Sequence, residues 1–461
     1  MKVKCISRDQ EVQTRERSSD VRKLHKNVDP VLHPLEQPRE YVRALNAVKL
    51  NRMFAKPFLC AMQGHRDGVY SIARHPTSLT TLVSGAGDGE IRIWNVASQT
   101  CASHAVVHSG IVRGLCFSPN GDSVLTCSSD KTVKRWMLST LQDVGTEDLS
   151  SSSRGQQEAA KAKAIFLGQH AFLGVDHVRG KGEVGSFVTC GAAVEVWDYH
   201  RSDPISTITW GTATTTSVAC NPVETNVFAS VGTDRNICLY DTRGQTAIRK
   251  VILKMKSNQI SWNPMEAFNF TVANEDSKCY TFDIRKLSVA RNIHKGHVDA
   301  VISLDYSPTG REFATGSYDK TIRIFSERGG QSRDVYHTKR MQRIFQVRYS
   351  GDSRFILSGS DDTNVRVWKA NASEKLGVIA PREKAKLAYS HQLRERYKHV
   401  PEVGRIDRQR HVPKPILNAS RLRVEMKESR RRKLRNVRAH SKPGAVPYEA
   451  ERLHATVEEE E

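Results

Sequence analysis

Histidine, a serine or threonine hydroxyl and aspartate recur together along this chain, and these three side chains are the components of a nucleophilic catalytic site. The two clearest sets are His65, Ser84 and Asp88, and His108, Thr126 and Asp130. A single active site needs only one such set, whereas this chain repeats the set at regular intervals. The repetition favours a structural role, in which hydrogen bonds satisfy a buried aspartate.

Each set is followed by an aromatic residue six positions after its aspartate, and these aromatic residues divide the chain into repeats. The clearest copies are SGAGDGEIRIWN (84–95), TCSSDKTVKRWM (126–137), TGSYDKTIRIFS (315–326) and SGSDDTNVRVWK (358–369). The terminal aromatic residues are Trp94, Trp136, Trp197, Tyr240, Phe282, Phe325 and Trp368, at intervals of 42, 61, 43, 42, 43 and 43 residues. A period of about 40–45 residues with a Gly-His start and a Trp-Asp end is typical of WD repeats.

Because each WD repeat builds a four-stranded blade, seven aromatic ends predict an all-β, seven-bladed WD-repeat β-propeller over residues 56–369. The interval of 61 residues contains DLSSSSRGQQEAAKAKA, and this composition predicts a flexible insertion at 148–164. The segment KPFLCAM (56–62) is predicted to close the ring as the outer strand of the last blade. EIRIW, TIRIF and NVRVW alternate apolar and polar residues, which predicts half-buried strands.

The motif residues are expected to stabilise the blades through hydrogen-bonded chains. The residues given this role are His65, Ser84, Asp88, Trp94, His108, Thr126, Asp130, Trp136, Asp234, Asp276, His297, Thr315, Asp319, Ser358, Asp362 and Trp368. The chain of the sixth blade is incomplete because Phe325 cannot donate, and Gly191 stands where the third blade needs aspartate. The sequence has no Walker-type loop, no Cys/His set at metal spacing and no isolated nucleophile, so we expect no enzyme, metal or cofactor.

The formal net charge of +21 favours a polyanionic partner, and the excess lies at the two ends of the chain. Lys and Arg exceed Asp and Glu by 13 to 7 in residues 1–56, by 35 to 30 in 57–368 and by 23 to 13 in 369–461. The nine cysteines form no CxxC pair, which favours free thiols in a reducing compartment. Neither a signal peptide nor a membrane span is expected.

The two flanks are predicted to be basic, partly helical extensions at 1–55 and 370–461. A short helix is expected at 39–54, with an apolar stripe of Tyr41, Leu45, Val48 and Met53. Two further helices are expected at 382–400 and 417–440, and their apolar stripes are too thin for a separate core.

The stretch KESRRRKLRNVRAHSKPG (427–444) has three interpretations: a nuclear address, a nucleic-acid contact or the solvated face of a helix. Our preferred interpretation is a helix, ordered on binding, that neutralises phosphates of a ribonucleoprotein. The residues expected to do so are Arg430, Arg431, Arg432, Lys433, Arg435 and Arg438. The sequence leaves open whether RNA or an acidic protein surface is the partner.

Several segments outside the WD motifs resemble the Sof family of nucleolar WD-repeat proteins. They include DPVLHPLEQPREYVRALNAVKLNRMFAKPFL (29–59), WNPMEAFNFTVANED (262–276), YHTKRMQRIF (336–345) and WKANASEKLGVIAPREKAKLAY (368–389). ESRRRKLRNVRAHSKPGAVP (428–447) is similar to the carboxy-terminal Sof-like domain of that family. The flanking segments carry this resemblance, because WD motifs alone occur in proteins of many functions.

The resemblance implies a non-catalytic scaffold of the small-subunit processome, working with the box C/D small nucleolar ribonucleoprotein in pre-ribosomal RNA processing. It also implies a location in the nucleus and nucleolus, and a monomer within a large complex without a membrane. As an alternative, it implies a substrate receptor of a cullin-4 type ubiquitin ligase, which docks on an adaptor through a Trp-Asp-x-Arg motif. The matching arginines here are Arg243 in YDTR and Arg285 in FDIR, where another aromatic residue replaces tryptophan, and WDYH (197–200) ends in histidine.

Overall fold

The computed structural model describes residues 30–143, 162–179, 185–209, 213–244, 246–442, 444–447 and 450–460. These residues form two compact units. The first contains residues 30–57 and 371–411, and the second contains residues 58–370 and 412–460. The segment 370–461, which the sequence suggested as one domain, is thus divided between the two units.

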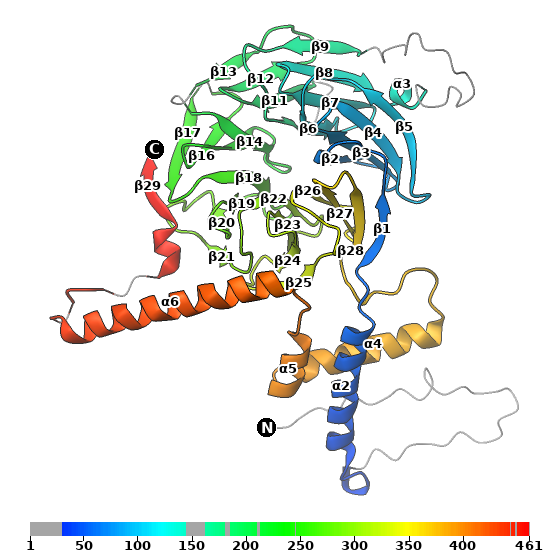
Figure 1. Cartoon of the computed structure of the whole chain (residues 1–461), viewed down its shortest axis with the longest axis vertical. Coiled ribbons are helices and arrows are strands. Elements are labelled where there is room, and N and C mark those ends of the chain that lie inside the picture. The colour runs from blue at the N-terminus through cyan, green and yellow to red at the C-terminus, as the bar shows by residue number, and fades with distance from the viewer. Residues whose placement is uncertain are drawn as a thin grey trace, which may run out of the picture. The chain divides into compact units, whose positions relative to one another are not determined.

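The second unit contains seven antiparallel sheets arranged around a central axis (Figure 1), as the predicted seven-bladed propeller requires. Blade 1 consists of β2 (Val69–Arg74), β3 (Thr81–Ala86), β4 (Glu90–Asn95) and β5 (Thr100–Val106). Blade 2 consists of β6 (Val112–Phe117), β7 (Ser123–Ser128), β8 (Thr132–Met137) and β9 (Ala164–Leu167), with α3 (Leu138–Asp143) after β8. Blade 3 consists of β10 (Gly174–His177), β11 (Ser186–Cys190), β12 (Val194–Asp198) and β13 (Ser206–Ile208).

The remaining four blades follow the same order from the inner to the outer strand. Blade 4 consists of β14 (Thr215–Cys220), β15 (Val227–Gly232), β16 (Asn236–Asp241) and β17 (Ala247–Leu253). Blade 5 consists of β18 (Ser257–Trp262), β19 (Asn269–Asn274), β20 (Cys279–Asp283) and β21 (Asn292–His294). Blade 6 consists of β22 (Val301–Tyr306), β23 (Glu312–Ser317), β24 (Ile322–Ser326) and β25 (Ser332–Tyr336). Blade 7 consists of β26 (Ile344–Tyr349), β27 (Phe355–Ser360), β28 (Val365–Lys369) and β1 (Phe58–Met62).

Blade 7 closes the ring with strands from distant parts of the chain. Strand β1 pairs antiparallel with β28, so that Phe58 lies opposite Trp368 and Met62 lies opposite Val365. The inner strand of blade 7, β26, contacts the inner strand of blade 1, β2. The predicted closure by residues 56–62 is therefore confirmed. Most of the predicted insertion at 148–164 lies outside the described residues, and its last position, Ala164, begins β9.

The core of the propeller lies between neighbouring blades. Trp94 of blade 1 belongs to one apolar cluster with Val365 and Val367 of blade 7, and Trp197 of blade 3 to another with Val133 of blade 2. Because blades cover one another on both faces, the middle strands are buried on both sides.

This packing corrects the predicted half-buried strands of NVRVW and TIRIF. Arg366 and Arg323, which occupy the polar positions of the alternation, are only 3% and 7% exposed. Arg366 forms an ion pair with Asp362 in the turn of its own hairpin, between β27 and β28. The sequence alternation is real, but the neighbouring blade covers the second face as well.

The first unit consists of η1 (Pro30–Leu32), α2 (Glu36–Met53), α4 (Pro381–Arg396) and α5 (Pro401–Asp407). The helix α2 contacts both α4 and α5. Leu393 of α4 and Val403 of α5 are buried in this unit, and Arg52 of α2 pairs with Asp407 at 3.3 Å. Segments from opposite ends of the chain thus form one small helical unit.

The buried face of α2 differs from the predicted apolar stripe. Its buried residues are Glu40, Ala44 and Val48, which follow one another every four positions on one side of the helix. Glu40 accepts hydrogen bonds from the Tyr397 hydroxyl at 3.2 Å and the Arg396 guanidinium at 3.4 Å. Of the predicted stripe only Val48 is buried. The buried face instead includes Glu40, a charged residue whose carboxylate is satisfied by Tyr397 and Arg396.

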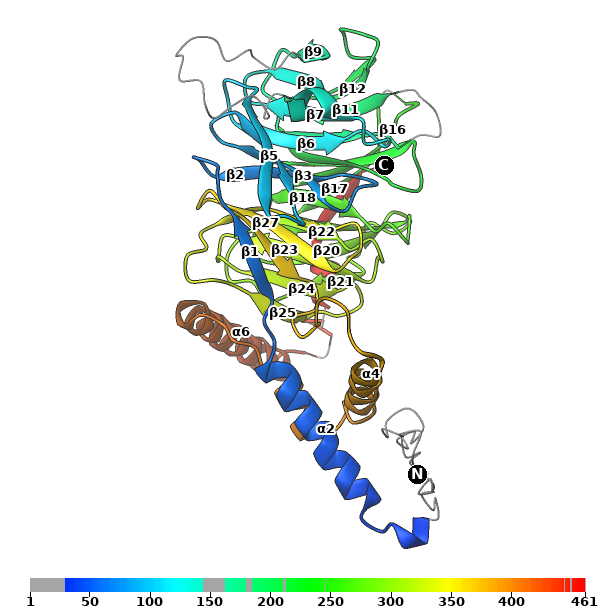
Figure 2. The same ribbon diagram turned by 90° about the vertical axis from the view of Figure 1, so that its right-hand side faces the viewer.

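The end of the chain belongs to the propeller unit. Helix α6 (Lys414–His440) is a single uninterrupted helix (Figure 1, Figure 2), followed by η2 (Glu451–His454) and the strand β29 (Thr456–Glu460). Strand β29 pairs antiparallel with β17, with Val251 opposite Glu459 and Ile252 opposite Glu458. Blade 4 therefore has five strands, and the last one covers its outer edge.

Candidate functional sites

Blades 2 and 6 contain the most complete hydrogen-bonded chains among the motif residues. In blade 2, His108 Nδ1 lies 2.9 Å from an Asp130 carboxylate oxygen and His108 Nε2 lies 2.7 Å from the Thr126 hydroxyl. The Trp136 indole N–H donates to the same Thr126 oxygen at 3.2 Å. Burial lowers the pKa of His108, so its imidazole is neutral near pH 7 and bridges two partners without carrying charge.

Blade 6 repeats this geometry without its final donor. His297 Nδ1 lies 2.8 Å from Asp319 and its Nε2 lies 2.7 Å from the Thr315 hydroxyl. Burial alone would raise the pKa of Asp319, but the facing His297 and the Thr321 hydroxyl outweigh it and hold that pKa well below its ordinary value. Phe325 packs against His297 and donates nothing, as its chemistry dictates.

In blade 1 the structure replaces one expected partner. Ser84 Oγ lies 2.6 Å from His65 Nε2 and accepts the Trp94 indole N–H at 2.7 Å. His65 Nδ1 faces Glu90 at 3.4 Å, however, and not Asp88. Asp88 is exposed and accepts the Glu90 backbone N–H at 3.1 Å, which shapes the turn. A glutamate two positions later reaches the imidazole because its side chain is one carbon longer.

Blades 5 and 7 keep only parts of this hydrogen-bonded chain. In blade 7 the Trp368 indole N–H donates to Ser358 at 2.9 Å, and Asp362 pairs with Arg366. In blade 5 the carboxylate of Asp276 accepts from the Tyr280 hydroxyl at 2.5 Å and from Lys278 at 3.0 Å.

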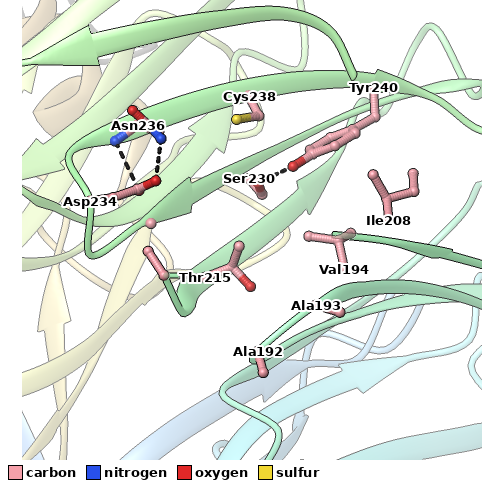
Figure 3. Close-up of a pocket in the computed structure, with 12 residues that line it drawn as sticks. Ala192, Ala193, Val194, Ile208, Thr215, Ser230, Asp234, Asn236, Cys238 and Tyr240 are labelled. Carbon is pink, nitrogen blue, oxygen red and sulfur yellow. Dashed lines mark hydrogen bonds between the residues drawn. The ribbon is translucent and has the colours of Figure 1, made fainter. Parts of the chain in front are cut away.

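Blade 4 separates the two halves of the motif (Figure 3). Asp234 is hydrogen-bonded to Asn236 within its own turn, and the Ser230 hydroxyl lies 3.1 Å from the Tyr240 hydroxyl farther along the strands. In the part of the chain that the structure describes, no histidine links the two pairs, so each pair stabilises its own part of the blade. Among the described residues of blade 3, the part of the motif that remains is the hydrogen bond from the Trp197 indole to Thr189, at 2.9 Å.

Burial makes the motif hydroxyls unsuitable as nucleophiles. The hydroxyl-bearing residues Ser84, Thr126, Thr315 and Ser358 are all 0% exposed. An attacking hydroxyl must reach a substrate atom, and these hydroxyls are enclosed between blades with tryptophan or histidine partners. These hydrogen bonds stabilise the blades. Among the described residues, no group of three or more His, Cys, Asp or Glu side chains is placed to hold a metal ion.

Helix α6 presents the predicted basic residues in a different setting. None of its 27 residues is buried. Arg430, Arg431, Arg432, Lys433 and Arg435 are exposed, and none of these five side chains forms a hydrogen bond or ion pair with another described residue. Arg438 differs, because its guanidinium donates to the backbone carbonyls of Val446 and Pro447 at 3.2 and 3.1 Å.

Contacts near the start and after the end of α6 attach it to the propeller. The Arg423 guanidinium donates to the Ser277 hydroxyl at 2.7 Å. Glu451, after the helix, contacts Lys427 of α6 as well as Lys278 and Lys295 of blade 5. Burial would raise the pKa of Glu451, but Lys295 and Lys427 lower it to about 2. These ion pairs could not be predicted from the sequence, because Glu451 and its partners are 24 to 173 positions apart.

The two arginines proposed for adaptor docking occupy equivalent positions in blades 4 and 5. Each follows the third strand of its blade, and each backbone N–H donates to the aspartate two residues earlier at 3.0 Å. The Arg285 side chain is 68% exposed and donates two further hydrogen bonds to Asp283, at 3.1 and 2.9 Å. Its guanidinium also lies over the Phe268 ring, 4.6 Å from the centroid. The Arg285 guanidinium thus contacts both Asp283 and Phe268 while most of the side chain stays exposed.

Comparison with known proteins agrees with the fold. Residues 56–95, 99–136, 289–326 and 333–369 match the WD domain, G-beta repeat family, and these matches omit the divergent blades 3 and 4 and all of blade 5 except β21. The WD40 β-propeller domain of Doa1 superposes with a TM-score of 0.55 at 16% identity, covering 68% of this chain and 96% of that one. This likeness concerns the fold alone. In the described part of the chain, no helix is long and apolar enough to span a membrane.

Residues 370–455 match the Sof1-like domain family. Across almost its whole length, the chain is similar to proteins named DDB1- and CUL4-associated factor 13. It is 48% identical to those of Danio rerio and Homo sapiens, with 98% of each chain covered. It is 43% identical to Protein SOF1 of Saccharomyces cerevisiae, covering 98% of this chain and 94% of that protein. The chain belongs to this family of WD-repeat proteins with a carboxy-terminal Sof1-like domain.

Proposed function

We propose that this chain is a non-catalytic scaffold of the small-subunit processome, needed for pre-ribosomal RNA processing and maturation of the small subunit. The observation that carries the proposal is the helix α6, whose five cations from Arg430 to Arg435 are exposed and have no partner among the described residues. Its partners are pre-ribosomal RNA, the box C/D small nucleolar ribonucleoprotein and other processome proteins. The protein acts as a monomer within that complex, in the nucleus and nucleolus.

The division of charge supports this role. A helix of 27 residues is about 40 Å long and can follow an RNA backbone over several phosphates. Contacts between Lys or Arg and phosphates give affinity and position without reading sequence. The propeller, whose motif hydroxyls are buried in its own hydrogen-bonded chains, supplies a scaffold with surface loops for protein partners.

The proposal is tested by ultraviolet crosslinking of the tagged protein in cells, followed by sequencing of the bound RNA. We expect crosslinks in small-subunit pre-ribosomal RNA and in box C/D small nucleolar RNA. Substituting Arg430, Arg431, Arg432, Lys433 and Arg435 by Gln should reduce these crosslinks and leave the propeller folded. A protein that crosslinks to neither RNA in its wild-type form would contradict the proposal.

A second function, as a substrate receptor of a cullin-4 type ubiquitin ligase, is favoured by the setting of Arg285. The names of the vertebrate relatives describe association with DDB1 and CUL4. Asp283 and Phe268 contact the Arg285 guanidinium in the free chain. Binding a partner therefore costs this side chain less conformational entropy. Arg243 is exposed at the equivalent position of the neighbouring blade.

Co-purification of the ligase adaptor tests this second function. The double variant Arg243→Ala/Arg285→Ala should lose the adaptor while retaining association with pre-ribosomal RNA. The matched control is Arg291→Ala, an exposed arginine of blade 5 that pairs with Glu266 and follows no Asp-x-Arg pattern. Normal recovery of the adaptor by the double variant would exclude this docking mode.

A further inference from the structure

One end of the central channel carries a group of stacked aromatic and guanidinium side chains. Tyr70 at the start of β2 and Phe345 at the start of β26 stack face to face, with centroids 4.4 Å apart and planes inclined by 10°. The Arg113 guanidinium lies over the Tyr70 ring at 5.2 Å. Tyr318 meets Phe345 edge-on at 6.4 Å, and Arg343 lies over the Tyr318 ring at 5.3 Å. We call these five residues the stacked mouth.

The topology puts the stacked mouth on a single face of the propeller. In an antiparallel blade, the start of the first strand, the turn between the second and third strands and the end of the fourth all lie on one side. Tyr70, Arg113 and Phe345 come from starts of inner strands, Arg343 directly precedes β26, and Tyr318 follows β23. The face thus receives residues from blades 6, 7, 1 and 2. A cavity of about 280 Å³ opens beside them between the inner strands.

The guanidinium groups and one aromatic ring of the stacked mouth are available for binding a ligand. Arg113 and Arg343 are exposed, and neither guanidinium has a carboxylate partner among the described residues. Tyr318 is 37% exposed although it is a large aromatic residue. A guanidinium stacked on a ring keeps its in-plane N–H donors and offers its outer face as a flat cationic platform.

The charge around the stacked mouth favours a polyanion. Loop 337–343 adds the exposed Lys339 and Arg340 beside Arg343. The facing loops of the same four blades add the exposed Arg66, Lys131 and Lys320. Their exposed acids are Asp67, Asp88, Asp299 and Asp361. Burial raises the pKa of Tyr70, and the nearby carboxylates of Asp67 and Asp361 raise it further. On this face of the four blades, seven exposed cations thus stand against four exposed acids.

We propose that the stacked mouth binds single-stranded RNA, with bases stacking on Tyr318 and on the guanidinium planes of Arg113 and Arg343. Single-stranded RNA is recognised by aromatic and arginine planes set among basic residues. An acidic peptide would bind the cations without needing the ring faces. This inference rests on the proposed function in a ribonucleoprotein. It adds a second RNA site, which lies on the propeller and binds by base stacking, whereas α6 contacts phosphates.

The test measures fluorescence anisotropy of the full chain with two probes, a single-stranded oligouridylate of about 12 nucleotides and the same length of RNA duplex. The mouth variant is Arg113→Lys/Tyr318→Ala/Arg343→Lys, which retains charge and removes the flat platforms. We expect its affinity for the single strand to fall roughly 5- to 100-fold and its affinity for the duplex to fall less than about twofold.

Two control variants make the outcome specific. Arg291→Lys changes an exposed arginine of blade 5 that directly precedes the fourth strand, β21, and so lies on the opposite face, and it should change neither affinity. The α6 variant with five glutamines should weaken both probes in similar proportion. Thermal unfolding checks that each variant is folded, which is expected because the substituted mouth residues are exposed.

The possible failures are distinguishable. If the mouth variant loses affinity for single strand and duplex equally, or for neither, the stacking site is wrong while the proposed function through α6 stands. If the wild-type chain binds no RNA, the proposed function fails as well. If the mouth variant loses a poly-glutamate peptide and keeps the oligouridylate, the surface binds an acidic protein segment and the RNA proposal is overturned.

Discussion

Two regions of the propeller unit use charged residues in opposite ways. Between the blades, Asp319, His297 and Arg366 are buried and each has a partner. On α6, Arg430 to Arg435 carry five cations that are exposed and have no described partner. Burying an unpaired charge is costly, whereas an exposed cation costs the fold almost nothing. Charges inside the propeller therefore maintain structure, and those on α6 are available for binding.

The largest expected effect is the loss of a buried partner. Asp319→Ala leaves His297 without its hydrogen-bond acceptor in a site where both side chains are at most 2% exposed. The Val298 backbone N–H and the Thr321 hydroxyl lose the same acceptor, and each buried donor left unsatisfied costs about 1–3 kcal/mol in the free energy of unfolding. Urea denaturation measures this loss.

Asp88→Ala is the matched control in blade 1, because Asp88 is exposed and His65 faces Glu90 instead. We expect Asp88→Ala to cost less than about 1 kcal/mol. Equal losses for the two aspartate variants would show that the motif position, and not the observed burial, determines the cost.

The second prediction concerns pH. Burial lowers the pKa of His294 to about 4, and its neutral ring donates from Nδ1 to the Gly329 carbonyl at 2.7 Å. The unfolded chain takes up this proton near pH 6.5, so this contribution to stability is present above pH 6.5 and is lost as the pH falls to 4. The loss is on the order of 3 kcal/mol.

Denaturation curves at several pH values measure this dependence. His294→Gln should flatten it between pH 6.5 and 4, although other buried histidines continue to contribute. His440→Gln, at the exposed end of α6, should leave it unchanged. A full pH dependence in the His294→Gln variant would contradict the assignment to this residue.

A smaller effect is expected where the two regions meet. Glu451→Gln weakens the ion pairs with Lys278, Lys295 and Lys427, but Glu451 is 39% exposed and solvent screens these pairs. We expect at most about 1 kcal/mol, seen as faster hydrogen exchange in β29 and not as a change in the propeller.

Glu425→Gln serves as the control, since Glu425 is an exposed carboxylate of α6 without a described partner. Equal exchange in β29 for both glutamate variants would mean that strand pairing alone holds the end of the chain.

The repeated part of the fold could be predicted from the sequence and the non-repeated part could not. Seven aromatic ends at a period near 43 residues define the blades, because every blade needs the same buried residues at the same places. Blade 1 shows the limit, since a spacing rule selects Asp88 while the longer side chain of Glu90 reaches the imidazole.

Strand β29 was missed because a run of glutamates has low β-propensity and no alternating pattern. It forms a strand through pairing with β17, about 200 positions earlier in the chain, and Glu459 lies near Arg249 at 3.8 Å. Glu40 was missed for a similar reason, because Tyr397 and Arg396, which satisfy it, come from the other end of the chain. Long-range partners of single residues leave no local signal.

The salt dependence of RNA binding tests the division between propeller and α6 most directly. The affinity for transcribed small-subunit pre-ribosomal RNA is measured from low to high salt, for the wild-type chain and for the variant with Gln at 430–433 and 435. Arg438 is kept because it holds Val446 and Pro447. The slope of log affinity against log salt should become shallower by about 3–4 units, with the unfolding temperature unchanged. An unchanged slope in a folded variant would contradict the account.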